Sequence, residues 1–156
     1  RHQVATWQKN TKWEVIDKRR LVNSWGRVAD FSYMRLAPHL FQKACNFKPQ
    51  SETAGLINQY GMVPIHKAIR TEGMPHRLRL QKHDSLAYWS PWDFENVWWM
   101  IRTIYHYLER PRVYEGVELT IPVGMKLGLN LGSMLEFKRP PTKREVREAL
   151  EQLREA

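Results

Sequence analysis

The sequence predicts a mainly α-helical protein with a small β element, and three observations support this fold class. Residues 90–110 place apolar side chains at helical spacing. Apolar and polar residues alternate strictly over residues 117–131, as in a half-buried strand. Pro and Gly mark the starts and ends of other helical segments. We therefore expect several short helices around one long central helix (about 91–110), a β hairpin or bent strand (about 117–137) and a C-terminal helix (about 143–155).

The central helix has start and stop signals of its own. Ser90 can cap it, Pro91 fits the first helical position, and Asp93 supplies a carboxylate three residues after the cap. Pro111 ends it because proline lacks an amide hydrogen and its ring clashes with the preceding turn. Its apolar face is bulky and aromatic, and we expect that face to need a partner surface. The face comprises Phe94, Val97, Trp98, Ile101, Ile104, Tyr105 and Leu108.

The N-terminal segments have weaker signals. Residues 1–10 are polar around an isolated Trp7 and predict an extended arm. Thr11 and Glu14 match a capping box, which predicts a helix from Lys12 to Trp25. Gly26 would end this helix. Further helices are expected at about 38–46, 52–60 and 65–72, separated by Pro49 and Gly61.

The remaining segments are an exposed strand, the alternating region and the terminal helix. Residues 74–84 alternate basic and apolar side chains, which predicts an edge strand or an extended segment. The alternating region is long for one strand, so a bend or hairpin is expected near Pro122–Gly124. Thr142 and Glu145 form a second capping box. The division expected from these patterns is an arm (1–10), a single globular domain (11–138) and a Pro-led C-terminal helix (139–156).

Charge is unevenly distributed along the chain. The net charge is +9, and residues 1–83 hold 15 Lys and Arg against 5 acids. A basic half favours contact with a polyanion, which could be RNA phosphate, anionic lipid headgroups or an acidic protein, although basic residues also serve solubility alone. The residues predicted to contact an anionic surface are Lys18, Arg19, Arg20, Arg77, Arg79 and Lys82.

Aromatic residues are abundant, with seven Trp, six Tyr and five Phe. Aromatic side chains fill cores, but they are also enriched at protein interfaces and at membrane–water boundaries. The central helix carries the densest group. Its predicted protein-interface residues are Trp92, Trp98, Trp99 and Tyr105.

No motif in the sequence indicates catalysis, a cofactor or a metal. Cys45 is the single cysteine, so a disulfide within one chain is excluded. His76 and His83 are the only histidines near each other in the sequence, but they match no metal-binding motif. We therefore interpret them as solvent-exposed basic histidines and not as metal ligands. Phosphate-binding loops and nucleophile motifs are absent from the sequence. We expect no catalytic, cofactor-binding or metal-binding residues, and no transmembrane segment because no stretch of about 20 residues is sufficiently apolar.

These observations favour a non-catalytic accessory subunit of a large assembly. The start at Arg1, the sequence pI near 9.9 and the single cysteine suit a mitochondrial matrix protein after removal of a presequence, although a trimmed fragment explains the start equally. A peripheral, matrix-side subunit of an inner-membrane respiratory or ATP synthase complex suits the aromatic load. A mitochondrial ribosomal protein that contacts rRNA through its basic N-terminal half is the alternative. A small enzyme of unknown chemistry is the third hypothesis.

Overall fold

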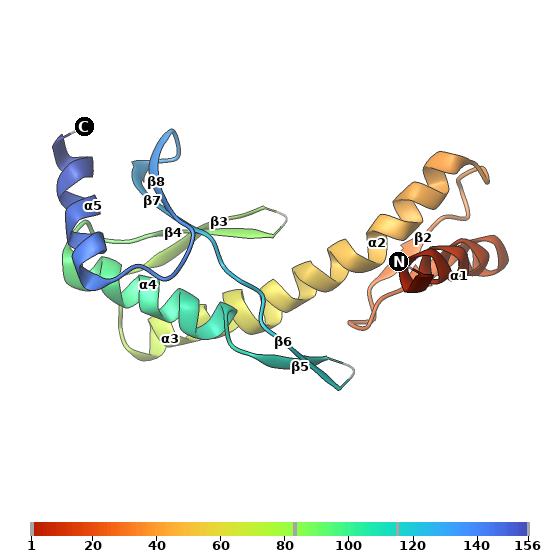
Figure 1. Cartoon of the computed structure of the whole chain (residues 1–156), viewed down its shortest axis with the longest axis horizontal. Helices are drawn as coiled ribbons and strands as arrows, with labels where there is room; N and C mark the ends of the chain where they lie inside the picture. Colours follow the sequence, from red (N-terminus) through yellow and green to blue (C-terminus); the bar gives the residue numbers. More distant parts are fainter. Residues whose placement is uncertain (1, 83, 115, 156) are drawn as a thin grey trace. The chain divides into compact units, whose positions relative to one another are not determined.

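The computed structural model describes residues 2–82, 84–114 and 116–155 (Figure 1). It is mainly helical, with small antiparallel strand pairs and a C-terminal helix, so the predicted fold class is confirmed. The chain forms two compact units, Arg1–Leu56 and Ile57–Ala156, called here the N-terminal and C-terminal units. This division differs from the expected single domain with a separate tail, because the last helix packs within the C-terminal unit.

The N-terminal unit contains two helices and one β hairpin. Its elements are α1 (His2–Lys18), β1 (Arg20–Val22), β2 (Val28–Asp30) and α2 (Pro38–Leu56). Strands β1 and β2 pair antiparallel, so that the inward side of the hairpin faces the two helices. One cluster of buried side chains joins all three: Val15, Leu21, Phe31, Leu40 and Ala44.

Helix α1 begins at the start of the chain, so the extended arm expected over residues 1–10 is wrong, as is the cap expected at Thr11. Thr11 is only 2% exposed and lies in the middle of the helix. Trp7, Thr11 and Val15 recur four residues apart along the inward side. The polar residues between them are acceptable in a helix, and this narrow buried stripe holds the first turns in place.

Helix α1 ends at Lys18, not at Trp25 as the sequence suggested. Arg19 adopts a φ of 55°, which turns the chain into β1. Gly26 has a φ of 75° and lies in the turn of the hairpin. In that turn the side-chain oxygen of Asn23 accepts hydrogen bonds from the amides of Trp25 (3.0 Å) and Arg27 (2.8 Å). These bonds explain why a hairpin forms where a helix was expected.

Helical backbone runs without a break from Pro38 to Thr71, through α2, a π-helical segment η1 (Ile57–Met62) and α3 (Val63–Thr71). The breaks expected at Pro49 and Gly61 do not occur. Pro49 lies inside α2 even though proline removes a helical hydrogen bond. Gly61 is buried, and a Cβ atom there would collide with the side chain of Leu108. Gly61 therefore permits close packing on a distant segment and does not end the helix.

The C-terminal unit contains three β hairpins besides η1, α3 and two further helices, among its described residues. The strand pairs are β3 (Arg77–Lys82) with β4 (Ser85–Trp89), β5 (Arg112–Tyr114) with β6 (Val117–Leu119), and β7 (Met125–Asn130) with β8 (Ser133–Phe137). The helices are α4 (Phe94–Leu108) and α5 (Lys143–Glu155). Two core clusters share α4: one packs it against α5 and the other against α3.

Helix α4 is the predicted helix near residues 91–110, but its cap differs. Asp93 is the N-cap residue, and its carboxylate accepts a hydrogen bond from the amide of Asn96 (2.9 Å). The cap expected at Ser90 is therefore wrong. Aspartate is as good a capping residue as serine, and its position sets the first helical turn.

The alternating region supplies one strand to each of two hairpins: β6 pairs with the preceding β5 and β7 pairs with the following β8. The β7–β8 hairpin lies within the expected range 117–137, and the strand is interrupted at 120–124, near the expected Pro122–Gly124 bend, although β6 and β7 do not pair with each other. The edge strand expected within 74–84 is also present, as β3, although the strand that pairs with it was not anticipated.

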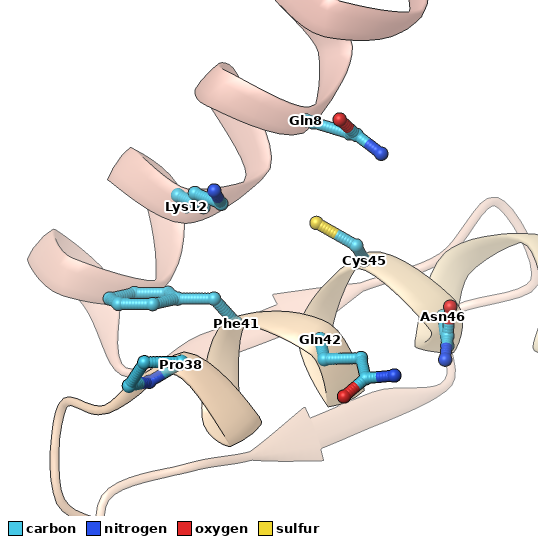
Figure 2. A pocket seen from close by; sticks show the side chains of 7 residues that line it. All are labelled: Gln8, Lys12, Pro38, Phe41, Gln42, Cys45 and Asn46. Carbon is cyan, nitrogen blue, oxygen red and sulfur yellow. The ribbon is translucent and has the colours of Figure 1, made fainter.

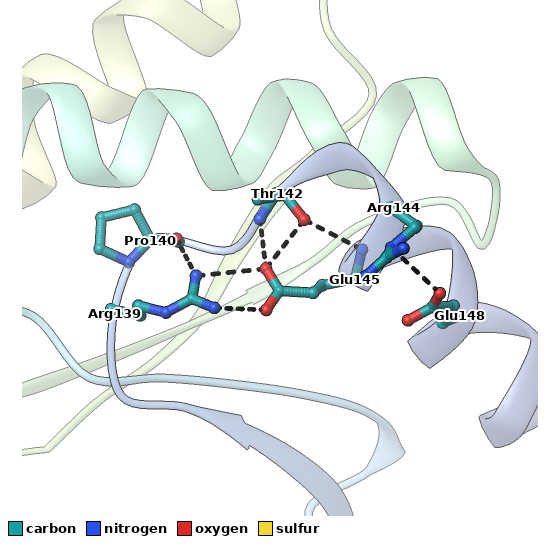
Figure 3. Close-up of polar contacts among 6 residues, drawn as sticks. All are labelled: Arg139, Pro140, Thr142, Arg144, Glu145 and Glu148. Atoms are coloured by element: carbon teal, nitrogen blue, oxygen red, sulfur yellow. Dashed lines mark hydrogen bonds and ion pairs between the residues drawn. The ribbon is translucent and has the colours of Figure 1, made fainter.

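Helix α5 follows its sequence signals closely. Thr142 and Glu145 form the expected capping box: the Thr142 amide donates to the Glu145 carboxylate (2.7 Å), and the Glu145 amide donates to the Thr142 hydroxyl (3.3 Å) (Figure 3). Arg139 adds an ion pair to the same carboxylate (2.6 Å). The apolar stripe expected to dock on its own domain is buried there, and consists of Val146, Ala149, Leu150 and Leu153.

Candidate functional site

A hollow of ≈ 390 Å³ lies between α1 and α2 of the N-terminal unit (Figure 2). Three amide side chains and one lysine form its polar walls, and Pro38 with half-buried Phe41 and Cys45 provides apolar surface. The lining residues are Gln8, Lys12, Pro38, Phe41, Gln42, Cys45 and Asn46. Among these described residues none is acidic, so the hollow suits a ligand that carries a negative charge.

The outward side of α1 continues from this hollow. Gln8, Lys12 and Ile16 lie four residues apart in one row, and Lys9 and Trp13 form the adjacent row. Trp13 is 60% exposed and Ile16 is 38% exposed. Both side chains lie outward because α1 buries the stripe of Trp7, Thr11 and Val15 instead.

The predicted anion-contact residues of the N-terminal unit differ in availability. Lys18 and Arg20 are exposed. Arg19, however, donates from its guanidinium to the carbonyl oxygens of Ser32 (3.4 Å) and Met34. This side chain holds the loop after β2, so a role in anion contact would compete with a structural one.

Arg77, Arg79 and Lys82 lie on β3, and all three are exposed. The pairing with β4 shifts between Leu78 and Leu80, so Arg79 is an extra residue at a β-bulge. The structure thus brings these cations onto one strand. His83, which the sequence analysis placed beside them, lies outside the described residues.

The predicted interface tryptophans are half-buried in the core of their own unit. Trp92 and Trp98 pack against the cluster shared by α4 and α5, and the Trp98 ring stacks on Phe94 with centroids 6.3 Å apart. Trp99 donates from its indole nitrogen to the Glu72 carboxylate (2.9 Å). Part of each ring remains accessible, and contact of that part with a partner stays a prediction.

Tyr105 requires a correction. Its side chain is only 9% exposed and belongs to the core cluster shared by α4 and α5. The residue cannot present its ring to a partner in this conformation, because the helix face that carries it is covered by α5. Residue type alone did not distinguish this aromatic from the accessible ones.

His76 was expected to be solvent-exposed, but it is buried, and neither of its ring nitrogens has a hydrogen-bond partner within the part of the chain that the structure describes. The same holds for the buried hydroxyl of the half-buried Tyr88. His76 is 3% exposed and its ring stacks on Trp99 with centroids 4.9 Å apart. Burial lowers the pKa of His76, an effect that the nearby Asp93 carboxylate opposes. Burial also raises the pKa of Tyr88 to about 12. Among the described residues no hydrogen bond joins either side chain to an acid or a base, as proton transfer would require.

A second hollow of ≈ 300 Å³ lies between η1 and the end of α4. Two arginines line it. Arg112 stacks over the Tyr60 ring at 4.1 Å and donates to the Tyr107 carbonyl oxygen (2.6 Å), so its guanidinium takes part in packing, whereas Arg110 is exposed.

Metal-binding groups do not gather in the described segments: no three His, Cys, Asp or Glu side chains are close enough to hold a metal ion. The helices of the described segments are all too short or too polar to cross a membrane. Neither a protein-family model nor a curated protein nor a solved structure matches this chain.

Proposed function

We propose that this chain is a non-catalytic accessory subunit of a large mitochondrial assembly. The observation that carries the proposal is the apolar surface of the β hairpins in the C-terminal unit. Large apolar side chains on or beside these hairpins are left about half exposed or more: Leu80 (47%), Trp89 (48%), Val113 (71%), Leu119 (51%), Ile121 (50%), Leu129 (58%) and Leu131 (71%). These side chains lie on or beside three separate two-stranded hairpins, and at two of them exposed apolar residues lie close along the chain, as Leu119 with Ile121 and Leu129 with Leu131 do. Apolar surface that is contiguous and exposed is typical of a site that a partner covers.

The strand pairing supports the same proposal. Each described sheet has only two strands, so each strand has an edge without a strand partner in this part of the chain. An isolated hairpin is marginally stable in water, and unpaired edges attract other chains. Between Lys126 and Glu136 the β7–β8 hairpin has no charged residue that would discourage such contact. Neighbouring subunits in an assembly would cover these edges and side chains.

Within this class we favour a peripheral, matrix-side subunit of an inner-membrane respiratory or ATP synthase complex. The exposed Trp13 and Trp89 and the excess of cations in the N-terminal unit support a location beside anionic headgroups. The partners would be other protein subunits, with anionic lipid as a secondary contact.

A mitochondrial ribosomal protein is the alternative, and one observation favours it. Lys18, Arg20, Arg77, Arg79 and Lys82 are all exposed, as contact with rRNA phosphates requires. A small enzyme has less support, because neither hollow brings together an acid, a base and a nucleophile among the described residues.

Native gel electrophoresis of detergent-solubilised mitochondria tests the proposal. We expect the chain to migrate with a large complex, and RNase treatment to leave its position unchanged. Release by RNase would support the ribosomal alternative, since phosphate contacts would then hold the chain in place. Migration as a free monomer in fresh extract would contradict both forms of the proposal.

A further inference from the structure

The hollow between α1 and α2 has the composition of a headgroup site. Lys12 supplies positive charge, and the amide groups of Gln8, Gln42 and Asn46 can donate hydrogen bonds to phosphate or hydroxyl oxygens. At ≈ 390 Å³ the hollow lies near the lower end of ordinary ligand sites, about 300–1,000 Å³. This space suits a polar headgroup and is small for an acyl chain.

The charges around the hollow favour an anion. Residues 1–56 hold ten Lys and Arg against four acids. Three of these acids already accept hydrogen bonds within the unit: Glu14 from Lys48 (2.8 Å), Asp30 from the Ser32 amide (2.8 Å) and Glu52 from the Ser24 amide (2.7 Å). The fourth, Asp17, follows Trp13 by one helical turn. Ten cations against four acids leave this unit a net charge of +6, and one of those acids, Glu14, forms an ion pair with Lys48.

The rows of α1 beside the hollow add an apolar component. Ile16 follows Lys12 in one row, and Trp13 follows Lys9 in the next. An exposed tryptophan beside lysines suits the membrane–water boundary, where indole rings are enriched. We call this surface the headgroup face; it comprises Gln8, Lys9, Lys12, Trp13 and Ile16 of α1 with Gln42 and Asn46 of α2.

We propose that the headgroup face binds anionic phospholipid, with one phosphate in the hollow beside Lys12 and with Trp13 and Ile16 at the boundary between headgroups and acyl chains. This inference rests on the proposed membrane-side function and names the surface that performs it. RNA is the competing polyanion. The exposed Trp13 ring could serve either ligand, since indole rings stack on RNA bases and also lie at membrane boundaries. Aliphatic Ile16 and half-buried Phe41 favour lipid, because neither offers an open aromatic face for a second base.

Vesicle flotation of the full chain tests the inference. We expect binding to vesicles of phosphatidylcholine mixed with phosphatidylglycerol, and little binding to phosphatidylcholine alone. Lys9→Gln and Lys12→Gln should each weaken binding about fivefold, which corresponds to about 1 kcal/mol per cation near an anionic surface. Trp13→Ser should weaken it several-fold, since the indole ring would no longer enter the interface.

Matched controls exist in the same unit. Lys43 is exposed on α2 but lies outside the headgroup face, so Lys43→Gln should change binding by less than about twofold. Val28 is 60% exposed, as Trp13 is, but it lies on the hairpin, so Val28→Ser should leave binding unchanged. Unchanged circular dichroism spectra would verify that each variant is folded.

Cys45 offers a second readout because it is the single cysteine and lines the hollow. Mixed anionic vesicles should slow its alkylation by a maleimide, and Lys12→Gln should remove most of this protection.

Failure of anionic vesicles to bind, or equal weakening by Lys43→Gln and Lys12→Gln, would overturn the inference. Single-stranded RNA that protects Cys45 better than vesicles do would overturn it in favour of RNA. Native-gel migration with a complex would still stand in each case, so the two proposals fail separately.

Discussion

At the level of single residues, His76 is the clearest link between burial and a measurable property. Its ring is 3% exposed and lies against Trp99, and burial lowers its pKa below the ordinary value of 6.5. The unfolded chain binds a proton at His76 as the pH falls below about 6.5, whereas the folded chain resists that proton. The contribution of His76 to stability is therefore complete above that pH and decreases as the pH falls through the lowered pKa.

We predict that the urea midpoint of unfolding falls between about pH 7.5 and pH 5, and that His76→Phe makes it less dependent on pH in this window. Phenylalanine preserves stacking on Trp99 but cannot bind a proton. His66 is exposed, so His66→Gln should keep the pH dependence of the parent chain. Equal flattening by both substitutions would show that buried His76 is not its source.

Gly61 makes a second prediction at this scale. In a helix interior alanine is ordinarily more stable than glycine by about 1 kcal/mol. At Gly61 the added Cβ atom would collide with Leu108, so Gly61→Ala should lower the free energy of unfolding by about 1–3 kcal/mol.

Two further variants check the origin of that loss. The double variant Gly61→Ala with Leu108→Ala should lose less unfolding free energy than the two single variants lose in sum, because the shorter side chain relieves the collision. Gly124 has open space around it and no positive φ, so Gly124→Ala should change stability by no more than about 0.5 kcal/mol. A stabilising Gly61→Ala would contradict the packing of η1 on α4.

At the level of secondary-structure elements, α5 shows how local signals and packing agree. Its capping box satisfies amides at the helix start, and its apolar stripe is buried in the C-terminal unit. Thr142→Ala should therefore lower the free energy of unfolding by about 1 kcal/mol. Thr142→Ser keeps a hydroxyl at the cap and should lose less. Equal losses in urea unfolding would show that the hydroxyl is not what stabilises the helix start.

Glu145 gives this element a pH dependence. Hydrogen bonds from Arg139 and Thr142 lower the pKa of Glu145 to about 2 from its ordinary value of 4.5. Because the folded state holds the carboxylate charged, this contribution to stability is present above pH 4.5 and is lost as the pH falls towards 2. Glu145→Gln should abolish the acid-dependent part of the loss, which thermal unfolding followed by circular dichroism at several pH values would measure.

Elements with local signals were predictable, and elements shaped by distant contacts were not. The caps and stripe of α5 all lie within a dozen residues, so the sequence alone identifies them. Pro49 and Gly61 look like helix breaks until the packing of Leu108 and the uninterrupted helical run are known. For the candidate site, Tyr105 was predicted to be an interface residue but is buried, whereas Trp13 was not predicted to be one and is exposed. The sequence reports the aromatic type but not which helix face is covered.

At the level of the whole molecule, the two units have different properties. The N-terminal unit holds most of the excess positive charge and the hollow, while the C-terminal unit carries hairpins with exposed apolar side chains. Such a chain would be bound by an anionic surface through one unit and by protein neighbours through the other. We expect neighbouring subunits to cover the hairpins.

Cysteine labelling at the tip of β7–β8 measures whether this hairpin is covered. Leu131 is 71% exposed, so Leu131→Cys in a Cys45→Ser background should react rapidly with a maleimide in the purified chain. Gln152→Cys, at an exposed position of α5, serves as the control. In an extract of mitochondria solubilised with mild detergent, we expect Leu131→Cys to be protected from the maleimide while Gln152→Cys stays reactive. Equal reactivity of Leu131→Cys in the pure chain and in the native extract would contradict the account.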